Sequence, residues 1–477
     1  MYTLDKMYVN GEWINPEASR LEKIINPASE EVIGEVALCS AADADQAVAA
    51  ARAAFPSWSR TTREERLQVL SRIAAIYQRR LQEMADFITL EMGAPKDMAF
   101  DSQAPMGLVH LQTAIQALKD YKFEESLDGT RVLQEPVGVC AFITPWNWPM
   151  NQIVCKVAPA LACGCTMVLK PSEMAPLSAQ LFAEIIHEAG VPAGVFNMLN
   201  GAGPEVGVAL GSHPDVDMVS LTGSTRAGIQ VSKAAADTIK RVALELGGKS
   251  PNIVLEDADF EKAVTDGVAE CFRNTGQSCN APTRMLVPRH LHDQAIELAV
   301  RVAGETVVGD PQQDATMIGP LSNAGQFKKV QGMIQQAIDE GSELACGGVG
   351  RPDGIERGYY AKPTVFANVT NDMMVAREEV FGPVLAIMPY DSEEQAIAIA
   401  NDSPYGLAAY VQSGKLEHAR AVATQLRAGN VFLNGNNYDP NAPFGGYKQS
   451  GNGREWGKFA FHDFLEIKGV VGFGKVD

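Results

Sequence analysis

The sequence predicts an α/β protein with two doubly wound, Rossmann-like parallel-sheet domains. The first observation is that short β-rich runs alternate with helical segments from Val137 onward, a pattern typical of strands joined by crossover helices. The second is that the same alternation begins again after Lys249. The third is the length, because 477 residues are too many for one simple core and favour two or three domains.

The individual elements follow from the spacing of apolar residues. Residues 41–54 and 63–92 carry apolar side chains at helical spacing and predict one amphipathic helix each. In the first α/β region we expect two helices and five strands: helices Leu177–Ala189 and Pro204–Leu210, and strands Val137–Cys140, Met167–Leu169, Val195–Met198, Met218–Leu221 and Val242–Leu244. In the second region we expect helices Phe260–Phe272 and Asp293–Ala303 and strands Asn252–Val254 and Arg284–Val287.

Charge and hydropathy exclude several classes of partner. The formal charge is −18, with 58 acidic against 40 basic residues, which argues against nucleic acid or an anionic membrane as the main partner. The longest apolar stretch, 157–169, is interrupted by Pro159 and Gly164 and is shorter than the ~18 residues of a membrane span. The first six residues lack the pattern of a secretory signal, so we expect no export.

The cysteines indicate a reducing environment. Eight cysteines in so long a chain do not form a disulfide framework, and free thiols favour the cytoplasm. Cys163 and Cys165 form the only tight pair, without the second pair that a zinc site needs. We therefore predict no metal.

One cysteine has a context suited to catalysis. Cys279 lies in the run Phe272-Arg-Asn-Thr-Gly-Gln-Ser-Cys-Asn280, and Glu245 precedes two glycines a few dozen residues upstream. A thiol nucleophile and a separate carboxylate base are what covalent catalysis requires. An inert core cysteine remains the alternative at this stage.

Four further runs have both a functional and an ordinary interpretation. Gly201-Ala-Gly203 with Gly207, and Gly223–Gly228 after a predicted strand, suit a pyrophosphate at a helix N-terminus, although either run alone is more often a turn. Lys170-Pro-Ser-Glu173 suits the ribose hydroxyls of adenosine or is a solvated ion pair. In Pro145-Trp-Asn-Trp-Pro149 the asparagine amide either donates to an oxyanion or caps a helix.

Taken in order, the runs resemble the NAD(P)-dependent aldehyde dehydrogenase superfamily over essentially the whole chain. The matching runs are Pro145–Pro149, Lys170–Glu173, Gly223–Thr225 with Gly228, Glu245–Lys249, Gly276–Cys279, Glu379–Pro383 and Pro443–Lys448. Each run alone is a weak signal, but seven runs in this order along the chain are specific to that superfamily.

The resemblance implies a mechanism. Cys279 would attack the aldehyde carbon to give a thiohemiacetal, and Asn147 with the Cys279 N–H would hold the oxyanion. Glu245 would activate the water that hydrolyses the resulting thioester. Glu455 matches an acidic residue that relays protons from Glu245, although a solvated helix charge is nearly as good an interpretation.

The resemblance also implies NAD as cofactor. The cofactor-binding residues would be Ile143, Thr144, Trp146, Lys170, Ser172, Glu173, Gly203, Gly207, Gly223, Ser224, Leu246, Glu379 and Phe381. A carboxylate at Glu173 on the ribose 2′-hydroxyl repels a 2′-phosphate, so NAD is favoured over NADP.

The resemblance implies an aldehyde substrate, whose class the sequence leaves open. The tunnel would be formed by a mixed aromatic and polar set: Trp148, Gln152, Cys155, Arg273, Ser278, Asn280, Asn437 and Phe444. Arg273 matches an arginine that succinic semialdehyde enzymes use for a substrate carboxylate. Cys155 stands where those enzymes have a second arginine. A general aliphatic or aromatic aldehyde is therefore the first choice and a carboxylated semialdehyde the second.

Domain organisation follows from the same resemblance. It implies an NAD-binding domain over 1–117 and 137–247, a catalytic domain over 248–449, and oligomerisation segments over 118–136 and 450–477. These last segments would form a small β arm, and we expect a homodimer or homotetramer. Two remoter alternatives are an enzyme that passes the acyl group to coenzyme A, whose members lack the residue equivalent to Glu245, and a non-catalytic NAD-binding protein.

Overall fold

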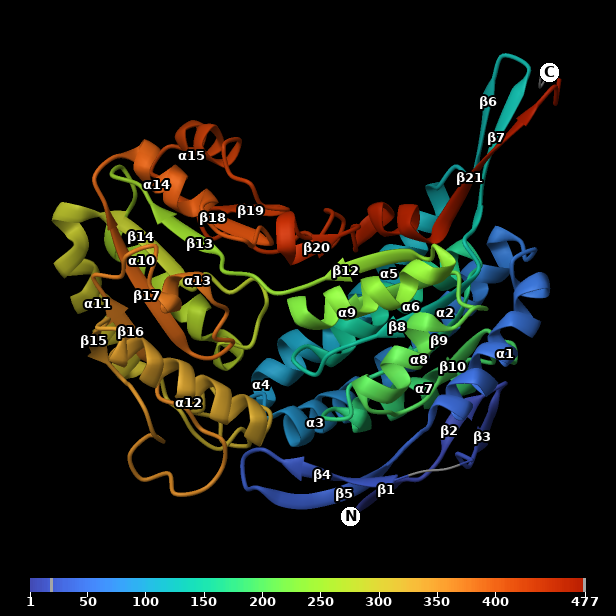
Figure 1. The fold of residues 1–477 in the computed structure, drawn as a ribbon, viewed down its shortest axis with the longest axis horizontal. Coiled ribbons are helices and arrows are strands. Elements are labelled where there is room, and N and C mark those ends of the chain that lie inside the picture. Colours follow the sequence, from blue (N-terminus) through green and yellow to red (C-terminus); the bar gives the residue numbers. More distant parts are fainter. Residues whose placement is uncertain (18–19, 475–477) are drawn as a thin grey trace.

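Two α/β domains lie side by side, and a β arm projects away from them (Figure 1). The computed structural model describes residues 1–17 and 20–474. An eight-stranded sheet forms the centre of the first domain and a seven-stranded sheet the centre of the second. The predicted α/β class with two parallel-sheet domains and a β arm is confirmed.

The first sheet has five parallel strands at its centre and antiparallel strands at both edges. Its order is β20 (Gly451–Asn452), β12 (Arg241–Glu245), β11 (Met218–Thr222), β8 (Val139–Ile143), β9 (Thr166–Lys170), β10 (Phe196–Met198), β2 (Met7–Val9) and β3 (Glu12–Ile14). The central strands are buried on both faces, which is why they read as continuous apolar runs.

Helices cover both faces of this sheet. On one face lie α2 (Arg63–Arg79), α3 (Leu81–Met92), α5 (Ala104–Asp120), α6 (Pro149–Cys163) and α7 (Pro176–Glu188). On the other lie α1 (Ala41–Trp58), α8 (Val208–Ser212) and α9 (Thr225–Ala235). Ser40 and Thr62 begin α1 and α2 with capping boxes, and Pro149 and Pro176 occupy the first turns of α6 and α7.

Two predicted helices differ from the structure. The single helix expected over 63–92 is two helices, because Arg80 leaves helical geometry and its guanidinium binds the carboxylates of Glu83 and Glu184. The helix expected over Pro204–Leu210 is instead a π-turn over Gly203–Gly207, followed by the single turn of α8. The short α4 (Lys96–Met98) and a second π-turn, Ala99–Gln103, lead into α5.

The second sheet is parallel except at one edge, where β15 runs antiparallel to β16. Its order is β15 (Glu343–Cys346), β16 (Thr364–Ala367), β17 (Val384–Tyr390), β14 (Arg284–Pro288), β13 (Pro251–Val254), β18 (Ala408–Gln412) and β19 (Asn430–Leu433). One face packs on α10 (Phe260–Phe272) and α11 (His292–Glu305). The other packs on α12 (Ala324–Asp339), α13 (Met374–Arg377), α14 (Glu393–Asn401) and α15 (Leu416–Ala423).

Two small sheets complete the fold. A three-stranded sheet near the N-terminus contains β1 (Tyr2–Leu4), β5 (Glu31–Leu38) and β4 (Arg20–Asn26). The arm contains β6 (Glu124–Leu127), β7 (Thr130–Pro136) and β21 (Leu465–Val471), with β21 beside β7 along its length (Figure 1). In the described part of the chain, no helix is long and apolar enough to cross a membrane.

The predicted oligomerisation segment 450–477 divides in two. Strand β20 pairs with β12 in the first sheet, and the 3₁₀ turns Gly457–Phe464 place Phe461 and Phe464 in the core of the first domain. Only β21 continues into the arm. The arm therefore begins about fifteen residues later than the sequence indicated, because the apolar residues of the preceding segment are buried against α5 and α6.

Candidate active site

A cavity of about 210 Å³ lies at the carboxyl edge of the first sheet, between the two domains. The first domain lines it with Pro145, Trp146, Asn147, Gln152, Thr222, Gly223, Ser224, Glu245, Leu246 and Gly247, and the second with Cys279, Gln326, Lys329, Glu379 and Phe381. Ligands of open parallel sheets bind at this edge. The structure thus brings most of the predicted catalytic and cofactor residues into one cavity.

The loop that carries Cys279 is held in an uncommon backbone conformation. Asn274 and Thr275 have φ of 55° and 57°, values that few residues other than glycine adopt. At Gly276, φ is 69° and a Cβ would lie 2.0 Å from Gly382 O, so the position requires glycine. The Gln277 side chain accepts from Ser322 N at 2.9 Å and donates to Asn274 O at 3.1 Å. These bonds position the thiol.

Asn147 lies between β8 and α6 and is bound to the same loop. Its Nδ2 donates to Gln277 O at 3.0 Å, and its backbone O accepts from Asn274 Nδ2 at 3.0 Å. An amide group carries two N–H donors, so one remains for a ligand atom in the cavity. The neighbouring Trp148 donates from Nε1 to Ser278 Oγ at 2.9 Å.

The environment of Cys279 favours the neutral thiol. Burial raises the pKa of the thiol, and the carboxylates of Glu379 and Glu245 raise it further. A neutral thiol is a weak nucleophile. The proton on Sγ must therefore leave before Cys279 reacts.

Glu245, at the end of β12, is a buried carboxyl group without hydrogen bonds. It is 5% exposed, and neither carboxylate oxygen has a hydrogen-bond partner among the described residues. Burial raises its pKa well above the usual value, Glu455 raises it further, and Lys156 opposes the shift. The close approach of Gly445, where a Cβ would lie 2.6 Å from Oε1, leaves Glu245 little space on that side. A carboxyl group with a raised pKa is a good general base near neutral pH.

Glu455 is buried next to this site and is fully paired. Lys156 Nζ forms an ion pair with Oε1, and Cys155 Sγ donates to Oε2 at 3.2 Å. The backbone of Glu455 pairs with that of Phe444. The solvated helix charge considered from the sequence is therefore wrong for Glu455, which is 8% exposed and lies outside any helix.

The predicted adenosine-binding residues lie further along the same edge, outside the 210 Å³ cavity. Lys170 Nζ donates to Glu173 Oε2 at 3.1 Å and to Gly201 O at 2.7 Å. Thr144 N donates to Lys170 O at 3.1 Å, which joins the ends of β8 and β9. The remaining members of this group are Ile143, Ser172, Gly203 and Gly207, at or after the ends of β8, β9 and β10.

These residues fit a dinucleotide. Thr144 Oγ1 and Thr222 Oγ1 are buried hydroxyls without hydrogen-bond partners in the described structure. No described atom lies within 4 Å of a Cβ built on Gly203, so a ligand has room to approach the backbone. Glu379 Oε1 accepts from Gly248 N at 3.0 Å, and Trp146 and Phe381 pack edge to face at 5.6 Å. Hydroxyl groups without hydrogen-bond partners, a backbone that a ligand can approach, and aromatic side chains along one wall are features of a nucleotide-binding site.

A second cavity, of about 460 Å³, contains Arg273 and Asn437 of the predicted tunnel. Asn280, the residue after Cys279, donates from Nδ2 to Tyr410 Oη at 3.2 Å and also to Tyr438 Oη, and both tyrosines line this cavity. A cluster of Cys155, Leu407, Phe444 and Trp456 packs against Cys279 and Tyr438.

Several residues that line the two cavities were not predicted from the sequence. Tyr410, Tyr438, Gln326 and Lys329 line them, and Trp456 stacks on Phe444 at 4.6 Å. Tyr438 had a usable signal, since it is an aromatic residue next to Asn437 in a polar loop. Gln326 and Lys329 had none, because their place depends on how α12 packs against the loop of Phe381, where Gln326 Nε2 donates to Phe381 O at 2.7 Å.

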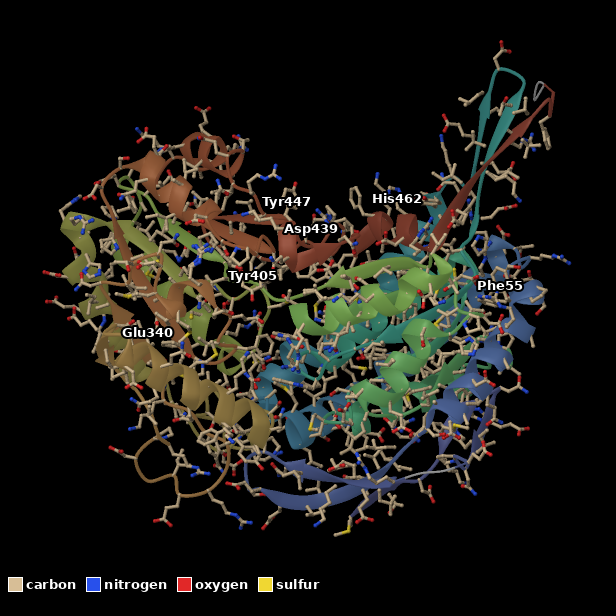
Figure 2. The ribbon with its side chains drawn as sticks, in the orientation of Figure 1. Phe55, Glu340, Tyr405, Asp439, Tyr447 and His462 are labelled. Carbon is tan, nitrogen blue, oxygen red and sulfur yellow. The ribbon has the colours of Figure 1, made fainter. Side chains whose placement is uncertain are left out.

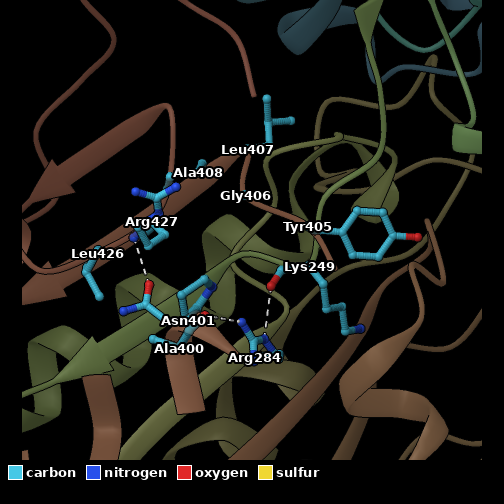
Figure 3. A pocket seen from close by; sticks show the side chains of 13 residues that line it. Lys249, Arg284, Ala400, Asn401, Tyr405, Gly406, Leu407, Ala408, Leu426 and Arg427 are labelled. Carbon is cyan, nitrogen blue, oxygen red and sulfur yellow. Dashed lines mark hydrogen bonds between the residues drawn. The ribbon is translucent and has the colours of Figure 1, made fainter. Parts of the chain in front are cut away.

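Arg284 fixes the segment that joins the two domains (Figure 3). Its Nε donates to Lys249 O and its Nη2 to Ala400 O, both at 2.9 Å. Burial lowers the pKa of Arg284 to about 10 and that of Lys249 to about 8. Lys249 Nζ is buried without a hydrogen-bond partner in the described structure. The carbonyl contacts hold the backbone between Glu245 and β13.

The two domains also meet through the loop before β18. Tyr405 and Tyr447 lie near the junction of the domains (Figure 2), and Tyr447 N donates to Gly406 O at 2.8 Å. Ser450 Oγ donates to Gly247 O at 2.7 Å and accepts from Gly406 N at 2.9 Å. Ser450 thus connects the segment after Glu245 with a loop of the second domain.

The fold and site define a class: two-domain α/β proteins with a cysteine in a cavity at the domain junction. A family model described as "Aldehyde dehydrogenase family" matches residues 13–470. The chain belongs to the aldehyde dehydrogenase family. The family and enzyme class predicted from the motifs are confirmed.

Individual relatives cover nearly the whole chain. A 3-succinoylsemialdehyde-pyridine dehydrogenase of a Pseudomonas species is 58% identical over 469 residues, which are 98% of each chain. An aldehyde dehydrogenase C mutant of Pseudomonas syringae, solved with NAD+ and octanal, has a TM-score of 0.98 and 54% identity over 99% of this chain and 98% of its own. A Mycobacterium tuberculosis aldehyde dehydrogenase with NAD+ has a TM-score of 0.96 and 40% identity over 98% of each chain.

Because Cys279 is held as a neutral thiol, we predict that the rate of its alkylation rises steeply with pH. With the pKa of Cys279 raised, the thiolate fraction rises about tenfold per pH unit below that pKa. Iodoacetamide should therefore inactivate the ligand-free protein at a rate that grows about tenfold per pH unit from pH 7 to pH 9, without a plateau. The residual rate of aldehyde oxidation measures this inactivation.

Mass spectrometry identifies the alkylated residue, and Cys279→Ala serves as the control that should lose the fast label. A plateau in the inactivation rate below pH 8 would mean that the protein stabilises the thiolate of Cys279, and it would contradict the raised pKa of this thiol.

Proposed function

We propose that this protein oxidises an aldehyde to a carboxylic acid with NAD as the hydride acceptor. The observation that carries the proposal is one cavity lined by the Cys279 thiol, the unpaired carboxyl group of Glu245 and the Asn147 amide. The NAD+ bound to the Pseudomonas syringae and Mycobacterium tuberculosis proteins supports the choice of cofactor.

Acylation begins when the Cys279 thiol gives its proton to solvent water and Sγ forms a C–S bond to the aldehyde carbon. The carbonyl oxygen becomes an oxyanion, which accepts from Asn147 Nδ2 and the Cys279 N–H. Bound NAD would supply the acceptor for the hydride that leaves the tetrahedral carbon. Collapse of that oxyanion to a carbonyl leaves a thioester on Sγ.

Deacylation uses Glu245 as base. The carboxylate accepts a proton from water as the water oxygen attacks the thioester carbon, and the C–S bond then breaks to release the acid. Glu455 receives protons from Glu245, and Lys156 balances its charge. Because Lys156 and Cys155 occupy both oxygens of Glu455, this relay requires one of those bonds to open.

The cofactor site follows the carboxyl edge of the first sheet. Lys170 and Glu173 hold the adenosine ribose, with Ile143, Thr144, Ser172, Gly203 and Gly207 beside them. Gly223 and Ser224, at the start of α9, hold the pyrophosphate. Trp146, Leu246, Glu379 and Phe381 surround the nicotinamide ribose and ring. The orphaned threonine hydroxyls and the open backbone at Gly203 support this assignment.

The preferred substrate is an aldehyde without a carboxylate. Around Cys279 the walls are aromatic, and octanal is bound to the Pseudomonas syringae relative. Arg273, the basis of the carboxylated alternative, is already partnered, since it donates to Ser102 Oγ at 3.0 Å and lies 3.9 Å from Glu270. The second arginine of the semialdehyde pattern is replaced by Cys155, whose thiol donates to Glu455.

Compartment and assembly complete the proposal. All eight cysteines are free thiols, which supports a reducing cytoplasm. On the arm, Leu127, Ile467 and Val471 are exposed by 54%, 75% and 85%, and β6 is an edge strand. Exposed apolar side chains along an edge support pairing with a second copy, as a homodimer or homotetramer.

Glu245→Gln separates acylation from deacylation. The variant keeps the shape of the side chain but removes the base, so mixing with NAD and aldehyde should still release about one NADH per site in a rapid burst. Steady-state kcat should fall by about 10²–10⁴. Stopped-flow absorbance at the nicotinamide band measures both phases.

Cys279→Ala is the matched control and should lose the burst as well as the turnover. Loss of the burst in Glu245→Gln would contradict a role confined to deacylation.

From the carboxylate of Glu173 we predict that the enzyme prefers NAD to NADP. The carboxylate repels a 2′-phosphate, so kcat/KM with NAD should exceed that with NADP by at least about tenfold, a difference of about 1.4 kcal/mol. Glu173→Gln should reduce the ratio mainly through KM for NADP. Initial rates at varied cofactor concentration measure it, and equal efficiencies in the unaltered protein would overturn the assignment.

From the exposed apolar side chains of the β arm we predict that the protein forms a homodimer or homotetramer. Light scattering after size exclusion should give a mass of two or four chains. Leu127→Lys combined with Ile467→Lys should shift the mass downward, because two charges replace buried apolar contacts. Unchanged circular dichroism controls for folding, and an unchanged mass would remove the arm from the interface.

A further inference from the structure

The 460 Å³ cavity adjoins the reactive cysteine through Asn280. This residue follows Cys279 in the chain and binds the hydroxyls of Tyr410 and Tyr438, which line the cavity. The Tyr410 hydroxyl also donates to Asn280 O at 3.1 Å. The cavity shares no lining residue with the 210 Å³ cavity of Cys279 and the predicted nicotinamide contacts, and its Tyr438 packs against the same cluster as Cys279.

Aromatic rings form one wall of the cavity. Tyr410 and Phe432 stack at 5.0 Å with an interplanar angle of 22°, and Tyr438 meets Phe432 edge to face at 4.8 Å. Electron-rich aromatic faces attract cations, and the attraction grows where water is partly excluded.

The charged side chains of the cavity favour a cation over an anion. Glu270 and Asp266 line it together with a single cation, Arg273, among the described residues. The Glu270 carboxylate raises the pKa values of Tyr410 and Tyr438, after the larger effect of their burial, so its charge acts on the aromatic wall. Asp266 is 57% exposed and pairs with Lys262 on the outer face of α10.

The guanidinium of Arg273 already contacts three protein side chains, which disfavours the binding of an anion to it. Its guanidinium donates to Ser102 Oγ at 3.0 Å, lies 5.6 Å from the centre of the Trp148 ring, and is 3.9 Å from Glu270. A substrate carboxylate would have to compete with Glu270 for this guanidinium.

We propose that Glu270 is a specificity-determining residue that selects aldehydes with a positively charged nitrogen at the end far from the carbonyl. The nitrogen lies against the Tyr410, Phe432 and Tyr438 wall, with the Glu270 carboxylate as its counter-charge. The proposal rests on the proposed aldehyde oxidation and deepens it. Anionic semialdehydes are selected against, because they meet the same carboxylate.

The test compares two aldehydes of the same shape. In 4-(trimethylammonio)butanal the far end is a quaternary nitrogen, and in 5,5-dimethylhexanal a carbon replaces it. With NAD at saturation, the unaltered protein should show a kcat/KM for the cationic aldehyde about tenfold above that for its neutral counterpart. Succinic semialdehyde should be a poorer substrate than either aldehyde.

Glu270→Gln should bring the ratio for the two aldehydes close to one, mainly through KM for the cationic member. Turnover of 5,5-dimethylhexanal should change by less than about twofold, which shows that the variant is folded and active. Asp266→Asn is the matched control: it removes the same charge from the same cavity and should keep most of the preference.

The possible outcomes separate this inference from the proposed function. If neither aldehyde yields NADH, the aldehyde oxidation itself fails. If 5,5-dimethylhexanal is oxidised but the cationic aldehyde has no advantage, only the substrate assignment fails. An advantage that survives in Glu270→Gln, or a preference for succinic semialdehyde, would also overturn the role of Glu270.

Discussion

The site depends on keeping the Glu245 carboxyl group buried without a hydrogen bond beside a thiol. An unpaired buried carboxyl group costs free energy of folding, on the order of 1–3 kcal/mol, and only a rigid surrounding can retain it. The parallel strand β12 provides that rigidity, because it is paired on both sides by β11 and β20. The short strand β20 is therefore part of the site's construction, although its two residues contribute little to the core.

In the second domain, strained backbone holds the loop that carries Cys279. Asn274, Thr275 and Phe381 all have positive φ, and each such residue costs about 1–3 kcal/mol. The strained segments meet at Gly276, which lies against Gly382 O. Arg284 and Ser450 then connect the segment after Glu245 to the second domain. Glu245 and Cys279 are held in position relative to each other because the domain junction is hydrogen-bonded next to both of them.

The sequence predicted elements where local pattern and tertiary environment agree. The central strands β8, β9, β11 and β12 were predicted from apolar runs. Short motifs predicted Cys279, Glu245 and Asn147 as site residues, and the structure places all three in one cavity. Prediction from the sequence failed where a contact between residues far apart in the chain decides the local structure. Arg80 ends a helix by binding Glu184, Phe461 takes its segment into the first core, and Tyr438 reaches the cavity from a polar loop. The contacts of Arg80 and Phe461 have no local signal in the sequence, and Tyr438 has only its aromatic side chain next to Asn437 in a polar loop.

Charge balance explains how three carboxyl groups can share so small a space. Glu455 is compensated by Lys156, and Glu379, which is half-buried, accepts from Gly248 N. Glu245 has no such partner, and its raised pKa means that it carries a proton over a wider pH range. Protonation of Glu245 removes a negative charge that otherwise raises the pKa of the Cys279 thiol. In the proposed reaction the carboxyl group acts only in deacylation, as a base that has lost its proton.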